Sequence, residues 1–276
     1  MRRPVYGLSR VISRGIDGEN FVVLSRGLLD AVIKTLKDVH AKWKIEDKRF
    51  LGTPICYEFD GELRPEQAVA AKALIAHDSG VLAAGTAFGK TVLAAWMIGE
   101  RKTNTLILVN KKPLMSQWVE RLSQFLNIPQ KEIGVWGGGK HKYTGKIDVA
   151  LIQSLVRRGA VNKEILGSYG QLIVDECHGV PATSFEAVTN VFTGKYILGL
   201  SATPVRRDGL HPIIQMQCGP LHYRVEAKQM AAFEHFEHRV NVRLTGFESS
   251  FVSQEKDEKP SNFCGLWVAV KCFAYS

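Results

Sequence analysis

The chain has 276 residues, of which 45% are hydrophobic, enough apolar material for one or two domains with a packed core. No apolar run approaches the roughly 20 residues that a membrane span needs, and no apolar segment follows the basic start Met1-Arg2-Arg3-Pro4, so neither a membrane protein nor a secretory signal is indicated. The net charge of +9 favours contact with phosphate backbones, although charge alone identifies no partner.

The cysteines are scattered and form no C-x-x-C pair: Cys56, Cys177, Cys218, Cys264 and Cys272. Their spacing therefore indicates neither a zinc site nor a disulfide framework. We expect reduced thiols in a cytoplasmic protein, because disulfides are rare in that compartment.

The first sixty residues predict a small accessory α+β module and a linker. Phe21 to Leu24 is a β-rich run, residues 28–39 carry apolar side chains at helical spacing, and Trp43 to Glu46 resembles a second strand. The segment from Gly52 to Gly61 is typical of a linker. The predicted order in residues 1–60 is therefore strand, helix, strand, linker.

From Leu63 onward, apolar strands alternate with helices. Strands are predicted at 81–84, 105–109, 148–152, 172–176 and 196–200, and helices at 66–76, 90–99 and around 115–118. Such alternation is typical of an α/β domain whose parallel sheet is covered by helices on both faces. Ligands of these folds bind at the carboxyl ends of the strands, where the polar motifs of this sequence fall.

A Gly-rich turn joins the strand at 81–84 to the following helix. Its sequence, Ala84-Gly85-Thr86-Ala87-Phe88-Gly89-Lys90-Thr91, follows the pattern G-x-x-x-x-G-K-[ST], except that alanine stands at the first glycine position. Backbone N–H groups of such a turn point at phosphate oxygens. The lysine brings its charge to the β- and γ-phosphates, and the threonine hydroxyl binds Mg²⁺. We therefore predict a P-loop that binds ATP through residues 85–91.

Two adjacent acids, Asp175 and Glu176, end the apolar run at 172–176. Because a buried acid without a partner is costly, the pair favours a functional site. Asp175 is placed to hold Mg²⁺, and Glu176 to act as general base on the attacking water. We interpret Cys177 as a packing residue and assign His178 a role in coupling.

The Gly-rich loop that contains Lys90 and the segment Asp175-Glu176-Cys177-His178 resemble motifs I and II of superfamily 2 helicases of the DEAD/DEAH type. Ser201-Ala202-Thr203 resembles motif III, and its extension to Gly209 is similar to the XPB-like and type III restriction-like branch. The resemblance implies the first RecA-like lobe in residues 61–230. It also implies ATP hydrolysis with Lys90, Asp175 and Glu176 as catalytic residues, and coupling of nucleotide state to nucleic-acid grip through His178, Ser201 and Thr203.

The same resemblance assigns contacts to flanking motifs. Leu63 to Gln67 is similar to the Q-type motif, which implies that Gln67 reads the adenine edge and that Arg64 lies near the nucleotide. The segments at 110–118 and 153–155 resemble motifs that touch the nucleic-acid backbone. The implied backbone contacts are Lys111, Lys112, Gln153 and Ser154.

The residues alone do not decide the roles of these outer motifs. Lys111 and Lys112 fit a solvated pair as well as a phosphate contact, and Ser201 with Thr203 fits a turn cap. Trp118 fits the core better than a base-stacking platform. The stretch from Gly137 to Lys142 predicts a flexible basic loop that could contact phosphate.

Motors of this superfamily need two RecA-like lobes, with arginine fingers from the second. About fifty residues follow Val225, and we interpret residues 231–276 as a truncated or disordered tail without a complete second lobe. The sequence thus predicts the N-terminal lobe of an ATP-dependent DNA or RNA helicase or translocase, with DNA favoured over RNA and a second lobe supplied in cis or trans. Two alternatives stay open: a non-motor nucleotide- and nucleic-acid-binding fragment, and the motor part of a restriction or DNA-defence system.

Overall fold

The computed structural model describes residues 15–157, 160–179, 182–202, 212–225, 240–242 and 268–270. The chain divides into two compact units, Met1–Glu226 and Ala227–Ser276. In the second unit, the described residues form the antiparallel strands β13 (Val240–Val242) and β14 (Val268–Val270). The rest of the predicted tail at 231–276 lies outside the described residues. No helix in the described part of the chain has the length and apolar character to cross a membrane.

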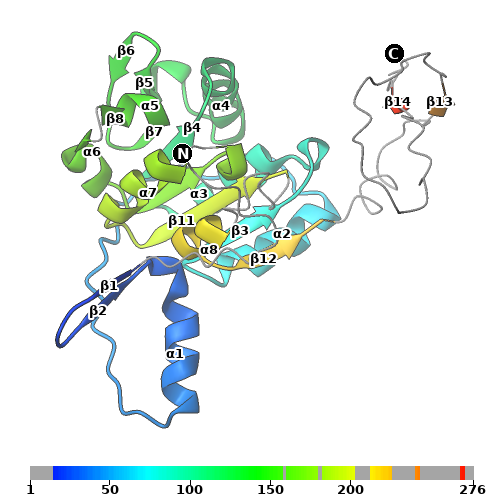
Figure 1. Cartoon of the computed structure of the whole chain (residues 1–276). Coiled ribbons are helices and arrows are strands. Elements are labelled where there is room, and N and C mark those ends of the chain that lie inside the picture. Colours follow the sequence, from blue (N-terminus) through cyan, green and yellow to red (C-terminus); the bar gives the residue numbers. More distant parts are fainter. Residues whose placement is uncertain are drawn as a thin grey trace, which may run out of the picture. The chain divides into compact units, whose positions relative to one another are not determined.

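A mostly parallel sheet forms the centre of the first unit (Figure 1). Its strand order is β12-β3-β11-β10-β4-β7-β5-β6, and only β5 and β6 pair antiparallel. The strands are β3 (Ser79–Ala83), β4 (Thr105–Val109), β5 (Gly134–Gly137), β6 (Lys140–Lys142), β7 (Ile147–Leu151), β10 (Gln171–Val174), β11 (Tyr196–Ser201) and β12 (Leu221–Arg224). All five predicted strands are present, and the predicted α/β fold is confirmed.

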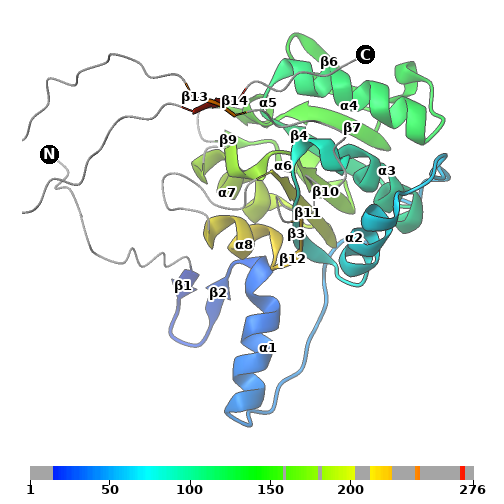
Figure 2. The same cartoon turned by 90° about the vertical axis from the view of Figure 1, so that its right-hand side faces the viewer.

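Helices cover both faces of this sheet, as the alternation predicted (Figure 2). One face carries α2 (Pro65–Ile75), α3 (Lys90–Arg101) and α4 (Lys112–Phe125). The other face carries α5 (Ile152–Leu155), α6 (Lys163–Gly167), α7 (Ala182–Val191) and α8 (Pro212–Cys218). Short 3-10 turns precede or follow some of these elements, and two of them, η2 (Thr86–Phe88) and η4 (Cys177–Gly179), lie at strand ends. A small hairpin, β8 (Val156–Arg157) with β9 (Ala160–Val161), follows α5.

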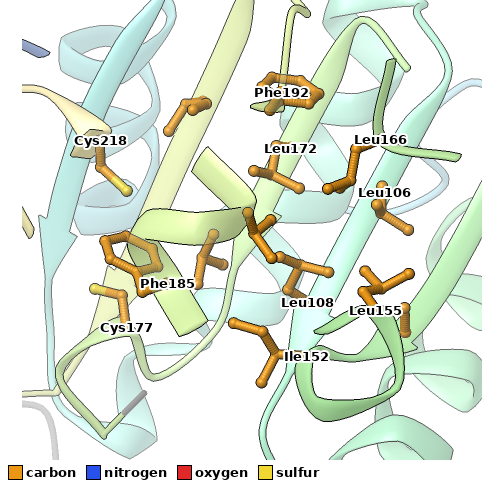
Figure 3. Close-up of a cluster of buried hydrophobic side chains, with 14 of the residues drawn as sticks. Leu106, Leu108, Ile152, Leu155, Leu166, Leu172, Cys177, Phe185, Phe192 and Cys218 are labelled. Carbon is orange, nitrogen blue, oxygen red and sulfur yellow. The ribbon is translucent and has the colours of Figure 1, made fainter. Parts of the chain in front are cut away.

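The core between the sheet and the face that carries α5, α6, α7 and α8 is apolar (Figure 3). Leu106, Leu108 and Leu172 project from β4 and β10 against Phe185 of α7 and Ile152 of α5, all nearly inaccessible to solvent. Burial of such side chains contributes roughly 1.5–3 kcal/mol each, so this layer fixes the sheet and thereby the edge at which its strands end.

The accessory module differs from the predicted order. β1 (Gly15–Asp17) pairs with β2 (Val22–Leu24), and η1 (Arg26–Leu28) and α1 (Leu29–Asp38) follow. The strand predicted at Trp43 to Glu46 was wrong, because these residues have no regular secondary structure. A β-prone run becomes a strand only where a neighbour completes its backbone hydrogen bonds, and β2 takes β1 as its partner instead.

The module is fixed to the lobe at η1. The Arg26 guanidinium donates to the carbonyls of Phe192 (3.2 Å), Gly194 (2.7 Å) and Lys195 (3.1 Å). A side chain on Gly27 would place its Cβ 2.3 Å from the Gln215 carbonyl oxygen, so η1 packs directly on the α8 backbone.

The predicted linker is irregular but runs along the lobe. Ile55 is buried, and Pro54 forms an isolated bridge with Thr103.

The stretch from Gly137 to Lys142 is a β-hairpin and not the flexible loop predicted from its composition. Gly137 closes β5, Lys140 opens β6, and the strands pair antiparallel. The φ angles of Gly137, Gly138 and Gly139 are +127°, +64° and +92°. Glycine adopts such angles without a Cβ penalty, so three glycines in a row allow the tight reversal.

Candidate nucleotide-binding site

The P-loop follows β3 as a compact turn. Ala84 leaves the strand, η2 forms the turn, and Gly89 has φ +81° directly before α3 begins at Lys90. The Phe88 side chain is buried and anchors the loop to the core, whereas Ala87 is exposed. Gly85 and Thr91 are partly exposed, and the side chain of Thr86 lies outside the described set. The N-terminus of a twelve-residue helix therefore lies at the turn, where backbone N–H groups favour an anion.

Arg64 and Gln67, from the Q-type motif, form hydrogen bonds to the backbone of this turn. Gln67, which is 3% exposed, donates from Nε2 to the Phe88 carbonyl (2.7 Å) and accepts at Oε1 from the Arg64 backbone N–H (3.0 Å). The Arg64 guanidinium donates to the carbonyls of Phe88 and Ala87. Both ends of the Gln67 amide are thus engaged with the chain itself. Contact of Gln67 with adenine stays a prediction.

Lys90 stands between the P-loop and the strand that carries the paired acids. Its side chain is 7% exposed, its Nζ donates to the Ala84 carbonyl (3.0 Å), and the same Nζ lies 3.4 Å from Glu176 Oε1. A buried ammonium with one carboxylate and one carbonyl as partners keeps a donor for a phosphate oxygen. The P-loop lysine and the paired acids therefore lie next to each other at the carboxyl ends of β3 and β10.

Asp175 is buried directly after β10 and is held at both carboxylate oxygens. Its Oδ1 accepts from the Glu176 backbone N–H (2.9 Å), and its Oδ2 accepts from the Trp118 indole N–H (2.7 Å). Burial raises the pKa of Asp175 above its ordinary value, and the neighbouring Glu176 raises it further; the Trp118 bond and Lys90 act in the opposite direction. The site therefore favours an added cation beside Asp175.

The residues present fit Mg²⁺ bound together with a nucleotide. Thr91 in the first turn of α3 supplies a hydroxyl and Asp175 a carboxylate, both oxygen ligands of the kind that Mg²⁺ prefers. Across the described residues, no group of three or more His, Cys, Asp or Glu side chains could hold a metal by itself. This donor set matches an ion that takes its remaining ligands from phosphate oxygens and water.

A polar chain links the acids to the next strand. His178 Nδ1 lies 3.2 Å from Glu176 Oε2 and 2.9 Å from Ser201 Oγ at the end of β11. Glu176 has φ +47°, a left-handed conformation that is uncommon for a non-glycine residue and is often found at functional sites. The structure thus joins three of the predicted residues, whereas Thr203 lies outside the described residues.

The predicted nucleic-acid contacts gather at one edge of the sheet. Lys111 and Lys112 are exposed after β4, and Gln153, in α5 after β7, donates to the Asn110 carbonyl (3.0 Å). A Cβ on Gly137 would lie 2.8 Å from Ser154 Oγ, and one on Gly138 would lie 2.8 Å from Lys112 Cε. β4, β5 and β7 run parallel, so these segments share the carboxyl edge of the sheet with the P-loop.

The bond from Trp118 to Asp175 is the feature that the sequence analysis missed. Trp118 is 1% exposed, which confirms its assignment to the core. A buried indole N–H nearly always needs an acceptor, so a core tryptophan in a nucleotide-binding lobe was a usable signal for a polar partner. The sequence alone does not say which acceptor it finds.

Residues 60–206 match the protein family described as "Type III restriction enzyme, res subunit". The DNA 3'-5' translocase XPB2 of Sulfurisphaera tokodaii is 34% identical over 170 residues, which cover 62% of this chain and 37% of that protein. The putative helicase 109L of Invertebrate iridescent virus 3 is 34% identical over 213 residues, covering 72% of this chain and 58% of that protein. The chain therefore spans less than two thirds of the length of these relatives, and the expected resemblance to the XPB-like and type III restriction-like branch is confirmed.

The fold has a solved counterpart. The crystal structure of the UvsW helicase from bacteriophage T4 aligns with a TM-score of 0.59 and 18% identity, covering 75% of this chain and 80% of that one. At this identity the likeness concerns the fold, and it confirms the predicted RecA-like architecture.

Proposed function

This chain belongs to the type III restriction enzyme res-subunit family, and on that premise we propose that it is the ATP-binding lobe of an ATP-dependent DNA helicase or translocase. The observation that carries the proposal is the position of Lys90, whose Nζ lies 3.0 Å from the Ala84 carbonyl and 3.4 Å from Glu176 Oε1. A lysine so placed joins a phosphate-binding turn to a paired-acid strand end, which is the arrangement that phosphoryl transfer requires.

Each residue then has a role in the proposed reaction. Lys90 and the backbone of the P-loop bind the phosphates of ATP, and Thr91 and Asp175 hold Mg²⁺. Held there, Mg²⁺ would supply positive charge that neutralises the phosphates during transfer. Glu176, whose Oε1 lies 3.4 Å from Lys90 Nζ, orients the attacking water and accepts its proton. Arg64 and Gln67 stabilise the P-loop through hydrogen bonds to its backbone carbonyls.

We propose that nucleic acid binds along the carboxyl edge formed by the segments after β4, β5 and β7. The exposed Lys111 and Lys112 meet backbone phosphates, Gln153 and Ser154 add polar contacts, and His178 with Ser201 couples this surface to the nucleotide. DNA is the favoured polymer, since S. tokodaii XPB2 is named a DNA translocase. A net charge of +9 supports a polyanionic partner.

The proposal extends to the division of the chain and to its partner. Residues 1–60 act as an accessory module, residues 61–230 as the ATP-binding lobe, and residues 231–276 as a tail. ATP in this superfamily binds between two lobes, so efficient turnover requires a second RecA-like lobe in cis or trans. A motor role within a restriction system is the second candidate, favoured by the description of the family.

ATP hydrolysis by the wild-type chain and by Glu176→Gln tests the proposal, each with and without single-stranded DNA, duplex DNA and RNA. Loss of a general base typically costs about 10²- to 10⁴-fold in rate, whereas the amide preserves the shape of the site. We expect Glu176→Gln to bind ATP like the wild type and to hydrolyse it at least about 100-fold more slowly. Normal turnover by Glu176→Gln would remove Glu176 from the reaction. Wild-type binding without any hydrolysis would mean that this chain is one lobe of a motor and that turnover has to be measured with the second lobe supplied.

A further inference from the structure

Trp118 is a fully buried residue with a polar contact inside the nucleotide site. It lies on α4 with Met115 and Leu122, the other residues that this helix buries. Its Nε1–H donates to Asp175 Oδ2 at 2.7 Å, a short distance for an N–H···O bond and typical of a charged acceptor.

This bond completes the hold on the Asp175 carboxylate. The Glu176 backbone N–H donates to Oδ1, so both oxygens have a donor and the carboxylate plane is fixed from two sides. Each carboxylate oxygen can accept more than one bond, so a lone pair remains for a further ligand. The indole is rigid and packed, and it therefore restrains the carboxylate more firmly than a flexible or solvated donor would.

We propose that Trp118 is a positioning residue for the metal site: its indole N–H holds Asp175 in the orientation in which this carboxylate binds Mg²⁺ with the nucleotide. The inference rests on the proposed function and adds a residue to that site. In this role Trp118 acts through Asp175, to which its indole N–H donates. Loss of a hydrogen bond to a metal-ligating group typically costs about 10- to 100-fold in metal affinity, which sets the size of the expected effect.

The alternative is a core tryptophan whose N–H merely finds an acceptor. The two readings differ in what Trp118→Phe changes. The phenyl ring keeps aromatic bulk in the core but removes the donor. A purely structural role predicts lower thermal stability alone, whereas a positioning role predicts a selective loss of the Mg²⁺ contribution to nucleotide binding.

The experiment measures the affinity of a fluorescent ATP analogue in EDTA and across a Mg²⁺ titration. The matched control is Trp136→Phe, which removes an indole N–H that donates to the Ser154 carbonyl at 3.4 Å. We expect Trp118→Phe to match the wild type within about twofold in EDTA and to need about 10- to 100-fold more Mg²⁺ for half-saturation. Trp136→Phe should match the wild type in both conditions.

Each result has a distinct meaning. If Trp118→Phe and Trp136→Phe need the same Mg²⁺ concentration, the inference is wrong. If the wild type binds no nucleotide in either condition, the proposed function fails first. If Trp118→Phe does not fold, the indole N–H resonance of Trp118 in the wild-type chain decides. It should shift when Mg²⁺ joins the bound nucleotide, and an unmoved resonance would overturn the inference.

Discussion

At the scale of single residues, the nucleotide site depends on close packing around Gly89. Its φ of +81° suits glycine, and a Cβ there would lie 2.6 Å from Gln67 Nε2. The same amide donates to the Phe88 carbonyl, so displacement of Gln67 would also release the loop. The glycine is therefore required by both backbone conformation and neighbouring side chain.

Gly89→Ala should accordingly impair both folding and binding. We expect the free energy of unfolding to fall by about 1–3 kcal/mol, because a left-handed alanine is strained and Gln67 must move. ATP affinity should fall as well. Urea unfolding and an ATP titration measure the two effects.

Gly139→Ala is the control, since Gly139 has φ +92° but open space around its Cβ position. It should lose stability from backbone strain alone and keep ATP affinity. Equal ATP binding by both alanine variants would refute the link between Gly89 packing and the nucleotide site.

At the scale of elements, α4 begins on the edge proposed for DNA. Lys111 precedes the helix and Lys112 opens it, both exposed. Each phosphate contact contributes a release of counterions, so loss of one contact lowers the salt dependence of binding by about one unit.

The double variant Lys111→Ala/Lys112→Ala should therefore weaken DNA binding for every sequence and reduce the slope of log affinity against log salt by about two. Fluorescence anisotropy of labelled single-stranded and duplex DNA measures both quantities. Lys72→Ala is the control, because Lys72 is exposed in the last turn of α2, away from the α4 edge. A double variant with the wild-type slope would show that the two lysines are a solvated pair.

The sequence predicted the elements that are fixed by local patterns. β4 matches its predicted range, and the P-loop and the paired acids lie at strand ends as expected. The sequence-based prediction failed for segments whose structure depends on pairing with residues elsewhere in the chain. The run at Trp43 to Glu46 has β propensity but no strand partner, and Gly137 to Lys142 forms a hairpin whose order comes from pairing of β5 with β7.

In the candidate site too, the sequence indicated the positions that follow from local pattern and missed the contacts between distant residues. Motif spacing indicated Lys90, Asp175 and Glu176, because strand-end position is a local property. The bonds of Trp118 to Asp175 and of Gln67 to Phe88 join residues 57 and 21 positions apart. Such contacts depend on helix packing, which the sequence pattern does not specify.

At the scale of the first unit, Arg26 joins the N-terminal module to the lobe. Its guanidinium is partly buried, donates to three carbonyls and lies 5.4 Å from the centre of the Phe192 ring. Burial lowers the pKa of Arg26 to about 10, which still leaves the group charged near neutral pH. The anchor is therefore a partly buried cation whose hydrogen bonds go to backbone oxygens.

Arg26→Ala should lower the free energy of unfolding by about 2–3 kcal/mol, because several charge-assisted bonds are lost and partly buried carbonyls lose their donor. Chemical unfolding measures this directly. Arg49→Ala is the comparison, since Arg49 pairs with Asp47 and Asp78 in a partly exposed position and should cost about 1 kcal/mol or less. An equal decrease in the free energy of unfolding for both variants would mean that Arg26 stabilises the chain no more than an exposed ion pair does.

The central claim is that this chain binds ATP through its P-loop lysine. A calorimetric titration of ATP with Mg²⁺ into the wild type, Lys90→Ala and Lys102→Ala tests it most directly. Lys102 is an exposed lysine paired with Glu58 on the surface, so its variant controls for loss of a positive charge. We predict wild-type affinity for Lys102→Ala and a loss of at least about tenfold for Lys90→Ala, since bonds to charged groups contribute about 1.5–3 kcal/mol. Unchanged ATP affinity in Lys90→Ala, or no binding by the wild type, would contradict the account.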